Sequence, residues 1–232
     1  MARIVTSMAW GLLLAVFMAG APAAWAQTIE EEDPARFAES VGGQVVLTNS
    51  GFGLGGHIRF AVRGLSFLAE ASLGAGKDAR EVAFFDRFGR RDVLNKANYF
   101  LMMPLHVGLE KRLFATRIED DFRPFVAVTM GPTLGWEYPY FDDDNDNGIL
   151  DPEERTYDAI SSIRRGTLKP GVGGMVSIGA HFGSARGMTQ GVRLGYSFTH
   201  FAEGVQLLER GIRDPQHFFG TPQIIVYFGR LR

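Results

Sequence analysis

Apolar and polar residues alternate along most of the chain, in segments separated by Gly, Asp, Asn and Pro. The clearest segment is 101–110, where Leu, Met and Val fill the odd positions and Met102, Pro104, His106, Gly108 and Glu110 fill the even ones. A period of two indicates β-strands, because successive side chains of a strand point to opposite faces. The helical period of 3.6 is nearly absent from the chain after its first residues, so the sequence predicts an all-β protein.

Seven further segments show the same alternation, each with one continuously apolar face and one small, polar or charged face. They are 41–48, 54–63, 65–73, 126–134, 172–182, 192–199 and 222–230. Eight strands are the smallest common number in an outer-membrane barrel, where the apolar face meets lipid and the polar face fills a narrow interior. We therefore predict an eight-stranded antiparallel up-and-down transmembrane β-barrel. A soluble barrel with an apolar cavity, of the lipocalin kind, would show the same alternation and remains an alternative.

The lengths of the connections favour the membrane barrel. The long connections follow odd-numbered strands, at 76–98, 141–167 and 203–218, whereas those after even-numbered strands are short, at 63–64, 114–121 and 183–190. Long outer loops and short inner turns are typical of bacterial outer-membrane barrels. Aromatic residues near the long loops predict an interfacial girdle. They are Tyr99, Phe100, Trp136, Tyr138, Tyr140, Phe218 and Phe219.

The first 26 residues have the pattern of an export signal. Arg3 supplies a positive charge, an apolar run follows, and Ala24-Trp25-Ala26 predicts cleavage before Gln27. We therefore divide the chain into a signal peptide (1–26), an N-terminal extension (27–38) and the barrel (39–232). The chain has no cysteine, which excludes thiolate metal sites and cysteine nucleophiles. Its formal net charge of −2 gives no indication of nucleic-acid binding.

With this signal, strand pattern and loop arrangement, the chain resembles the small outer-membrane β-barrel proteins of Gram-negative bacteria, the OmpA/OmpX-like and PorT-like superfamily. The resemblance spans roughly 39–232 and rests on the segments MPLHVGLEKRL and RPFVAVTMGPTLG and on the last strand, PQIIVYFGRLR. It implies insertion into the outer membrane and carries no catalytic motif. One departure is that Phe228 is followed by Gly-Arg-Leu-Arg, where such barrels usually end on Phe.

Five charged residues fall on the polar faces of the predicted strands: Arg59, Arg63, Glu70, Glu110 and Arg193. In a narrow lumen they could line a polar conduit or pair with one another as a plug. The plug is the favoured interpretation, because side chains fill the interior of an eight-stranded barrel. Buried charges are also tolerated only when they are paired.

The most specific motif is residues 143–154, Asp-Asp-Asn-Asp-Asn-Gly-Ile-Leu-Asp-Pro-Glu-Glu, which fill the calcium-loop pattern D-x-[DN]-x-[DN]-G-x5-E. Ca²⁺ takes about six to eight oxygen ligands. The predicted ligands are Asp143, Asn145, Asn147, the Ile149 carbonyl, Asp151 and Glu154. Strands rather than helices flank this EF-hand-like loop, so we predict a weak stabilising Ca²⁺ site without a helix switch. The competing interpretation is a solvated acidic turn.

An enzymatic alternative rests on Ser197, His200 and Glu203, since some small outer-membrane barrels modify lipid A with such groups. Ser197 and His200 point to opposite faces of a regular strand, which disfavours this hypothesis. The remaining histidines, including His57, His106, His181 and His217, lack metal-ligand spacing. The sequence therefore favours a non-enzymatic barrel that contacts outer-membrane lipid and binds a surface partner through its outer loops. Envelope integrity, adhesion and partner binding stay open as its roles.

Overall fold

The computed structural model describes residues 40–62, 65–78, 80–85, 87, 91–114, 118, 121–145, 147–183, 188–211 and 214–231. The predicted signal peptide, the N-terminal extension and Arg63 lie outside these residues. Within the described part of the chain, no helix is long and apolar enough to cross a membrane.

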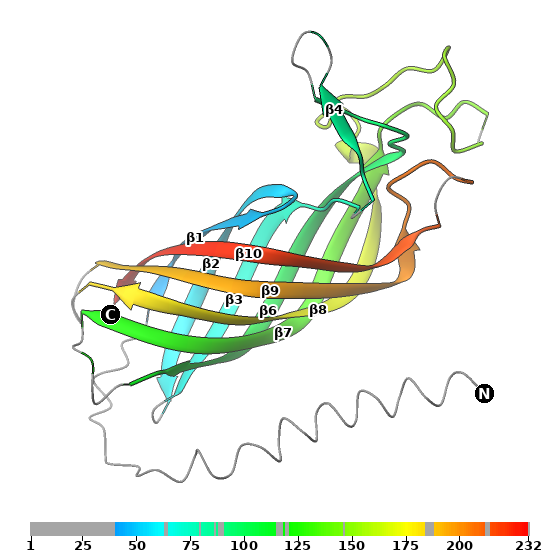
Figure 1. The fold of residues 1–232 in the computed structure, drawn as a ribbon. Helices are drawn as coiled ribbons and strands as arrows, with labels where there is room; N and C mark the ends of the chain where they lie inside the picture. Colours follow the sequence, from blue (N-terminus) through cyan, green and yellow to red (C-terminus); the bar gives the residue numbers. More distant parts are fainter. Residues whose placement is uncertain are drawn as a thin grey trace, which may run out of the picture. The chain divides into compact units, whose positions relative to one another are not determined.

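Eight long strands form one closed antiparallel barrel (Figure 1). In chain order they are β1 (Ser40–Thr48), β2 (Gly51–Val62), β3 (Leu65–Ala75), β6 (Asn98–Arg112), β7 (Phe122–Pro139), β8 (Thr167–Phe182), β9 (Met188–Val205) and β10 (Gln216–Leu231). Each strand pairs with its neighbours in the chain, and β1 pairs with β10 from Ser40↔Leu231 to Thr48↔Gln223. The predicted all-β, eight-stranded up-and-down barrel is therefore confirmed.

The outer wall of the barrel is apolar. Val107 of β6, Met130 of β7 and Leu194 of β9 are 54%, 64% and 53% exposed. Their chain neighbours point inward and are buried, including His106, Thr129 and Arg193. The period of two in the sequence thus separates an apolar outer wall from a polar lumen, as predicted.

Close contact between strands inside the barrel depends on glycine at some positions. Gly108 of β6 faces the backbone of β7, and a Cβ on Gly108 would overlap the Val128 carbonyl oxygen. A larger residue at this position would therefore push β6 and β7 apart.

Three long connections meet one end of the barrel, which we call the loop end. They are 76–97, which contains the small hairpin of β4 (Ala83–Phe85) and β5 (Arg91–Val93), then 140–166, which contains the 3-10 helix η2 (Ile163–Arg165), and 206–215. The fourth connection at this end is the tight turn Asn49–Ser50 between β1 and β2.

The aromatic girdle forms only in part. Tyr99 stacks on Tyr138 with ring centroids 5.3 Å apart, and Tyr140 contacts the edge of the Tyr99 ring. Phe100 and Phe219, however, are buried and pack against Phe201 in the interior. The prediction was wrong for these two residues because neighbours on a strand face opposite ways, so Phe100 cannot share the outer wall with Tyr99.

Candidate functional site: the lumen and the loop end

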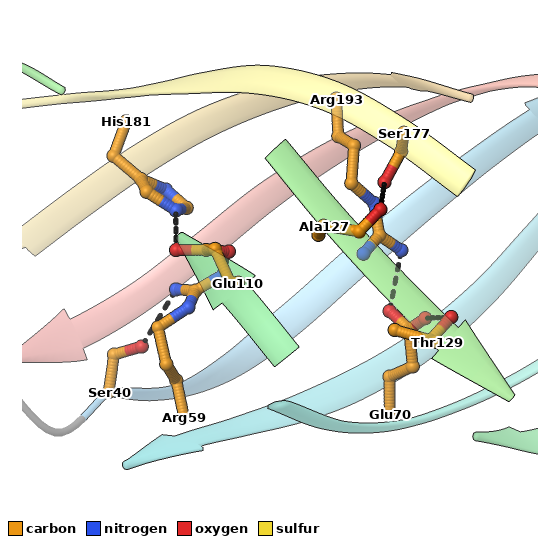
Figure 2. A network of polar contacts seen from close by, with 9 residues as sticks. All are labelled: Ser40, Arg59, Glu70, Glu110, Ala127, Thr129, Ser177, His181 and Arg193. Carbon is orange, nitrogen blue, oxygen red and sulfur yellow. Dashed lines mark hydrogen bonds and ion pairs between the residues drawn. The ribbon is translucent and has the colours of Figure 1, made fainter. Parts of the chain in front are cut away.

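An ion-pair cluster fills the lumen near the ends of β1 and β6. Arg59 Nη2 lies 3.0 Å from Glu110 Oε2, and Arg59 Nη1 donates to Ser40 Oγ at 3.1 Å (Figure 2). His181 Nε2 lies 3.0 Å from the other Glu110 oxygen. Glu110 is thus held by side chains of two other strands, β2 and β8. This pairing removes much of the cost of burying its charge.

A second cluster lies further along the lumen, between β3, β7 and β9. Arg193, which is 0% exposed, donates from Nη2 to Glu70 Oε2 at 2.6 Å, and Thr129 Oγ1 donates to Glu70 Oε1 at 3.0 Å (Figure 2). The buried Tyr227 ring joins the two clusters, with its centroid 5.2 Å from the Arg193 guanidinium carbon and 5.6 Å from that of Arg59. Both arginines therefore gain a cation–π contact in addition to their ion pairs.

An apolar cluster fills the lumen toward the loop end. Phe100, Phe201, Phe219, Val205 and Leu207 are buried together, with Met102 packed against them. A cavity of about 40 Å³ touches both this cluster and the second ion-pair cluster, since Met102 and Glu70 line it. This volume holds little more than water. Four of the five predicted lumen charges are thus found in ion pairs across the barrel, which supports the interpretation of a structural plug.

The three long connections bond to one another at the loop end. Ala97 N donates to Leu207 O at 3.0 Å, and Glu209 N donates to Asn95 O at 2.9 Å. Arg80, paired through its guanidinium with Asp78 at 2.6 Å, also donates to Asp214 O at 3.1 Å. The bond with Asp78 raises the pKa of Arg80, which stays charged. Connections 76–97 and 206–215 are therefore joined at several points.

The predicted calcium loop is docked on connection 206–215. Arg210 N donates to Gly148 O at 3.1 Å, and Leu150 N donates to Glu209 Oε1 at 3.2 Å. Glu209 is itself buried, although it lies in a connection. No sequence pattern singles out this residue, because its role depends on tertiary contact between two segments far apart in the chain.

At Gly148 the backbone has the conformation that the motif requires. Gly148 has φ +73°, a left-handed conformation that glycine adopts without strain. Asp143 accepts from Gly148 N at 2.8 Å and from Asn147 N at 3.0 Å, so the first ligand position is wrapped by the turn. Glu154 accepts from Asp144 N at 3.2 Å and from Asp151 N at 2.9 Å, which joins the two ends of the loop.

Five of the six predicted ligand residues are linked by these bonds and by two more. The side-chain amides of Asn145 and Asn147 both donate to Asp151 Oδ2, at 2.8 and 3.1 Å. Ile149 N also donates to Asn147 Oδ1 at 2.6 Å. Among the described residues, no three His, Asp or Glu side chains cluster as a metal site. The ligand set of the motif, however, includes two asparagines and a carbonyl. The donor chemistry and the turn fit Ca²⁺.

The base of the loop is closed by its own contacts. Phe141 and Thr156 form an antiparallel bridge, and Asp142 N donates to Arg155 O at 2.9 Å. Tyr157 interacts with Asp142 and Arg165, and the hydrogen bond to Asp142 raises the pKa of Tyr157. Further on, the backbone N–H groups of Ser161 and Ile160 donate to Asp158 and hold the pKa of its carboxyl below the ordinary value.

A polar cavity of about 490 Å³ opens beside the predicted calcium loop at the mouth of the barrel. Lys169 Nζ lies 3.6 Å from both Glu137 Oε2 and Glu203 Oε2, and Asp143 and Gly148 also line the cavity. Glu137 accepts from Gln206 N at 2.7 Å. The mouth is therefore bridged by charged groups above the apolar cluster.

The residues of the enzymatic hypothesis have other partners. Ser197 Oγ accepts from Gln223 Nε2 at 2.7 Å and donates to Thr221 O at 3.4 Å. His200 stacks on His217 with centroids 6.3 Å apart, and Glu203 pairs with Lys169. Ser197 and His200 are not hydrogen-bonded to each other, since they lie on opposite faces of β9 as predicted.

These features define the chain as an eight-stranded up-and-down β-barrel with a paired, filled lumen and interlocked loops. The solved structure of Neisserial surface protein A (NspA) is similar over 84% of this chain and 94% of its own, with TM-score 0.40 and 6% identity. Acinetobacter baumannii CarO is similar over 82% of this chain and 97% of its own, with TM-score 0.31 and 10% identity. No family model matches the sequence. No curated protein matches it either.

Proposed function

We propose that the chain is a non-enzymatic outer-membrane β-barrel protein of a Gram-negative bacterium, exported by its signal peptide. The observation that carries the proposal is the apolar outer wall of a closed barrel, with Val107, Met130 and Leu194 more than half exposed. Lipid is the environment that stabilises such a wall, because exposing a large apolar surface to water is unfavourable. A lipocalin-like carrier would need the opposite arrangement, with an apolar cavity inside.

The loop end serves as a contact surface. Three connections are bonded to one another there, and the lumen below is filled by ion pairs and aromatic side chains. A filled lumen does not favour transport as the main task. The hydrogen bonds between the connections support a role in envelope integrity, in adhesion or in binding a partner protein outside the cell.

Ca²⁺ binds the loop at Asp143, Asn145, Asn147, Ile149, Asp151 and Glu154 and clamps connection 140–166 to connection 206–215. The support for this is the complete motif, the positive φ of Gly148 and the bonds that link the side chains. The expected affinity is that of extracellular modules, with Kd about 10⁻⁴ to 10⁻³ M.

Fractionation tests the membrane proposal. The protein should sediment with the outer membrane and should migrate faster on a gel before boiling than after it, because a folded barrel resists detergent. Recovery in the soluble periplasmic extract would refute the proposal.

Calorimetric titration with Ca²⁺ in detergent tests the metal site, using two double variants that remove equal charge from the same loop. Asp143→Ala with Glu154→Ala removes two ligands and should abolish binding. Asp144→Ala with Glu153→Ala removes the neighbouring exposed carboxylates and should leave binding near the wild-type level. Equal loss in both variants would mean that only the net charge of the loop attracts the ion.

A further inference from the structure

An apolar groove of about 400 Å³ runs across the outer wall of the barrel just below the loop end. Its floor is a row of side chains on three neighbouring strands, in register with one another. Leu101 pairs with Trp136, and Trp136 with Leu168. Leu73, Met103 and Leu134 form the next row down the wall. The groove is therefore part of the wall that the proposed function turns toward lipid.

One edge of the groove is formed by the connection above it. Ile163 of η2 lines the groove, and its carbonyl oxygen accepts a hydrogen bond from Trp136 Nε1 at 2.8 Å. Gly166 then passes so close to the indole that a Cβ there would overlap Trp136 Nε1 and Cε2. Buried Ser162 begins this turn, and Arg165 N donates to Ser162 O at 2.9 Å. The turn 162–166 is thus fastened to the wall through Trp136.

The same turn places positive charge next to the groove. Arg164 follows Ile163 directly, is exposed, and makes no hydrogen bond or ion pair with the residues that the structure describes. Arg165 is already engaged by Asp142 and by the Tyr157 ring, 4.5 Å from its guanidinium carbon. A tryptophan in the groove, with an arginine in the turn that forms the edge of the groove, complements an acyl chain below and an anionic headgroup above.

We propose that this groove binds one acyl chain of a phosphorylated, multiply acylated glycolipid of the outer leaflet, lipid A, with Arg164 contacting its phosphate. The proposal rests on the proposed membrane location and deepens it by naming a lipid and the residues that select it. Arginine is suited to this contact because its planar guanidinium offers several donors to phosphate oxygens.

The chain provides its own reporter for a test. Trp136 lies in the groove, and the other two tryptophans, Trp10 and Trp25, are in the predicted signal peptide. The protein purified from membranes would be titrated with bis-phosphorylated lipid A in neutral detergent, and Trp136 emission would be followed after subtracting that of Trp136→Phe. A saturable blue shift is expected.

Two comparisons distinguish a site from the general lipid annulus. Arg164→Ala should weaken binding about three- to ten-fold, consistent with one exposed charge-assisted contact, and dephosphorylated lipid A should bind the wild type equally weakly. Leu101→Phe fills the groove and should remove saturation, whereas Leu109→Phe, on the wall of the same strand at its other end, should not.

The outcomes separate the two proposals. An identical emission change with zwitterionic phosphatidylcholine, or an unchanged titration in Arg164→Ala and Leu101→Phe, would overturn the lipid site while leaving the membrane location standing. Recovery of the protein in the soluble fraction would instead refute the proposed function, which the fractionation experiment decides independently.

Discussion

Arg193 and Glu70 are 123 positions apart in the sequence and meet in the lumen with 2.6 Å between Nη2 and Oε2. The two residues are on β3 and β9, which are not neighbouring strands and face each other only across the barrel interior. The ion pair therefore forms only when the barrel has closed, and it links the early and late halves of the chain.

Removing one partner of this pair should destabilise the barrel strongly. Glu70→Gln or Arg193→Gln alone should lower the free energy of unfolding by about 3–5 kcal/mol, because each leaves a buried charge without its counter-charge. Glu70→Leu combined with Arg193→Met should recover much of that loss. Urea unfolding in detergent measures all three, with exposed Glu153→Gln as the control. Additive losses in the double variant would contradict the pairing.

Phe201 should matter more to stability than an aromatic residue on the wall. Phe201 is fully buried among Phe100 and Phe219, so Phe201→Ala leaves a cavity and should cost about 3–5 kcal/mol. Phe60→Ala, on the exposed outer wall, should cost clearly less, because detergent can fill the space. The same unfolding assay compares them, and equal costs would argue against an interior aromatic cluster.

The turn that carries Arg164 should depend on glycine at position 166. Gly166→Ala would force the backbone away from the Trp136 indole and break the bond from Nε1 to Ile163 O, shifting tryptophan emission to the red. Gly43→Ala is the matched control, since a Cβ there meets no atom closer than 3.8 Å. A Gly166→Ala spectrum like that of wild type would mean that the turn is not held against the indole.

Calcium should protect the loop from proteolysis. Arg155 follows Glu154, the last of the proposed ligands, and is exposed, so it is a trypsin site at the end of the proposed clamp. Millimolar Ca²⁺ should slow cleavage there several-fold by mass action on the folded loop, and chelation should restore the faster rate. In Asp143→Ala with Glu154→Ala the rate should no longer respond to Ca²⁺. A response to Mg²⁺ of the same size would refute a selective site.

Acid should loosen the turn that begins at Asp158. The N–H groups of Ser161 and Ile160 hold the pKa of Asp158 below its usual range, so their contribution is present above the unfolded pKa of about 4 and is lost as the pH falls through the folded pKa. Carboxyl chemical shifts measured by NMR should give a titration midpoint below that of an unfolded peptide. A midpoint at or above the peptide value would show that these hydrogen bonds do not persist in solution.

The wall and the lumen could be predicted from the sequence because a strand alternates its side chains, and the segment 101–110 shows this without interruption. The same alternation places Tyr99 and Phe100 on opposite faces of β6. The two residues therefore cannot belong to one girdle. The rest could not be found this way. Glu209 docks on Leu150 through contacts between two loops, and loop packing leaves no periodic trace in sequence.

The candidate ligands lie together because they are local, whereas the groove depends on register. The motif at 143–154 is a short continuous segment, so its chemistry can be recognised from spacing alone. The pairing of three strands is what brings together Leu101, Trp136 and Leu168. The register of that pairing cannot be read from the sequence.

The pairing of β1 with β10 determines when the barrel can close. Its nine paired positions join Ser40 through Thr48 to the final strand, ending at Leu231. Until that strand has been synthesised, both β1 and the growing edge expose unpaired backbone groups, which readily recruit strands from other chains. At the proposed outer-membrane location, insertion would therefore not be completed during synthesis, and the polypeptide would have to reach the membrane as a whole, kept apart from its copies on the way.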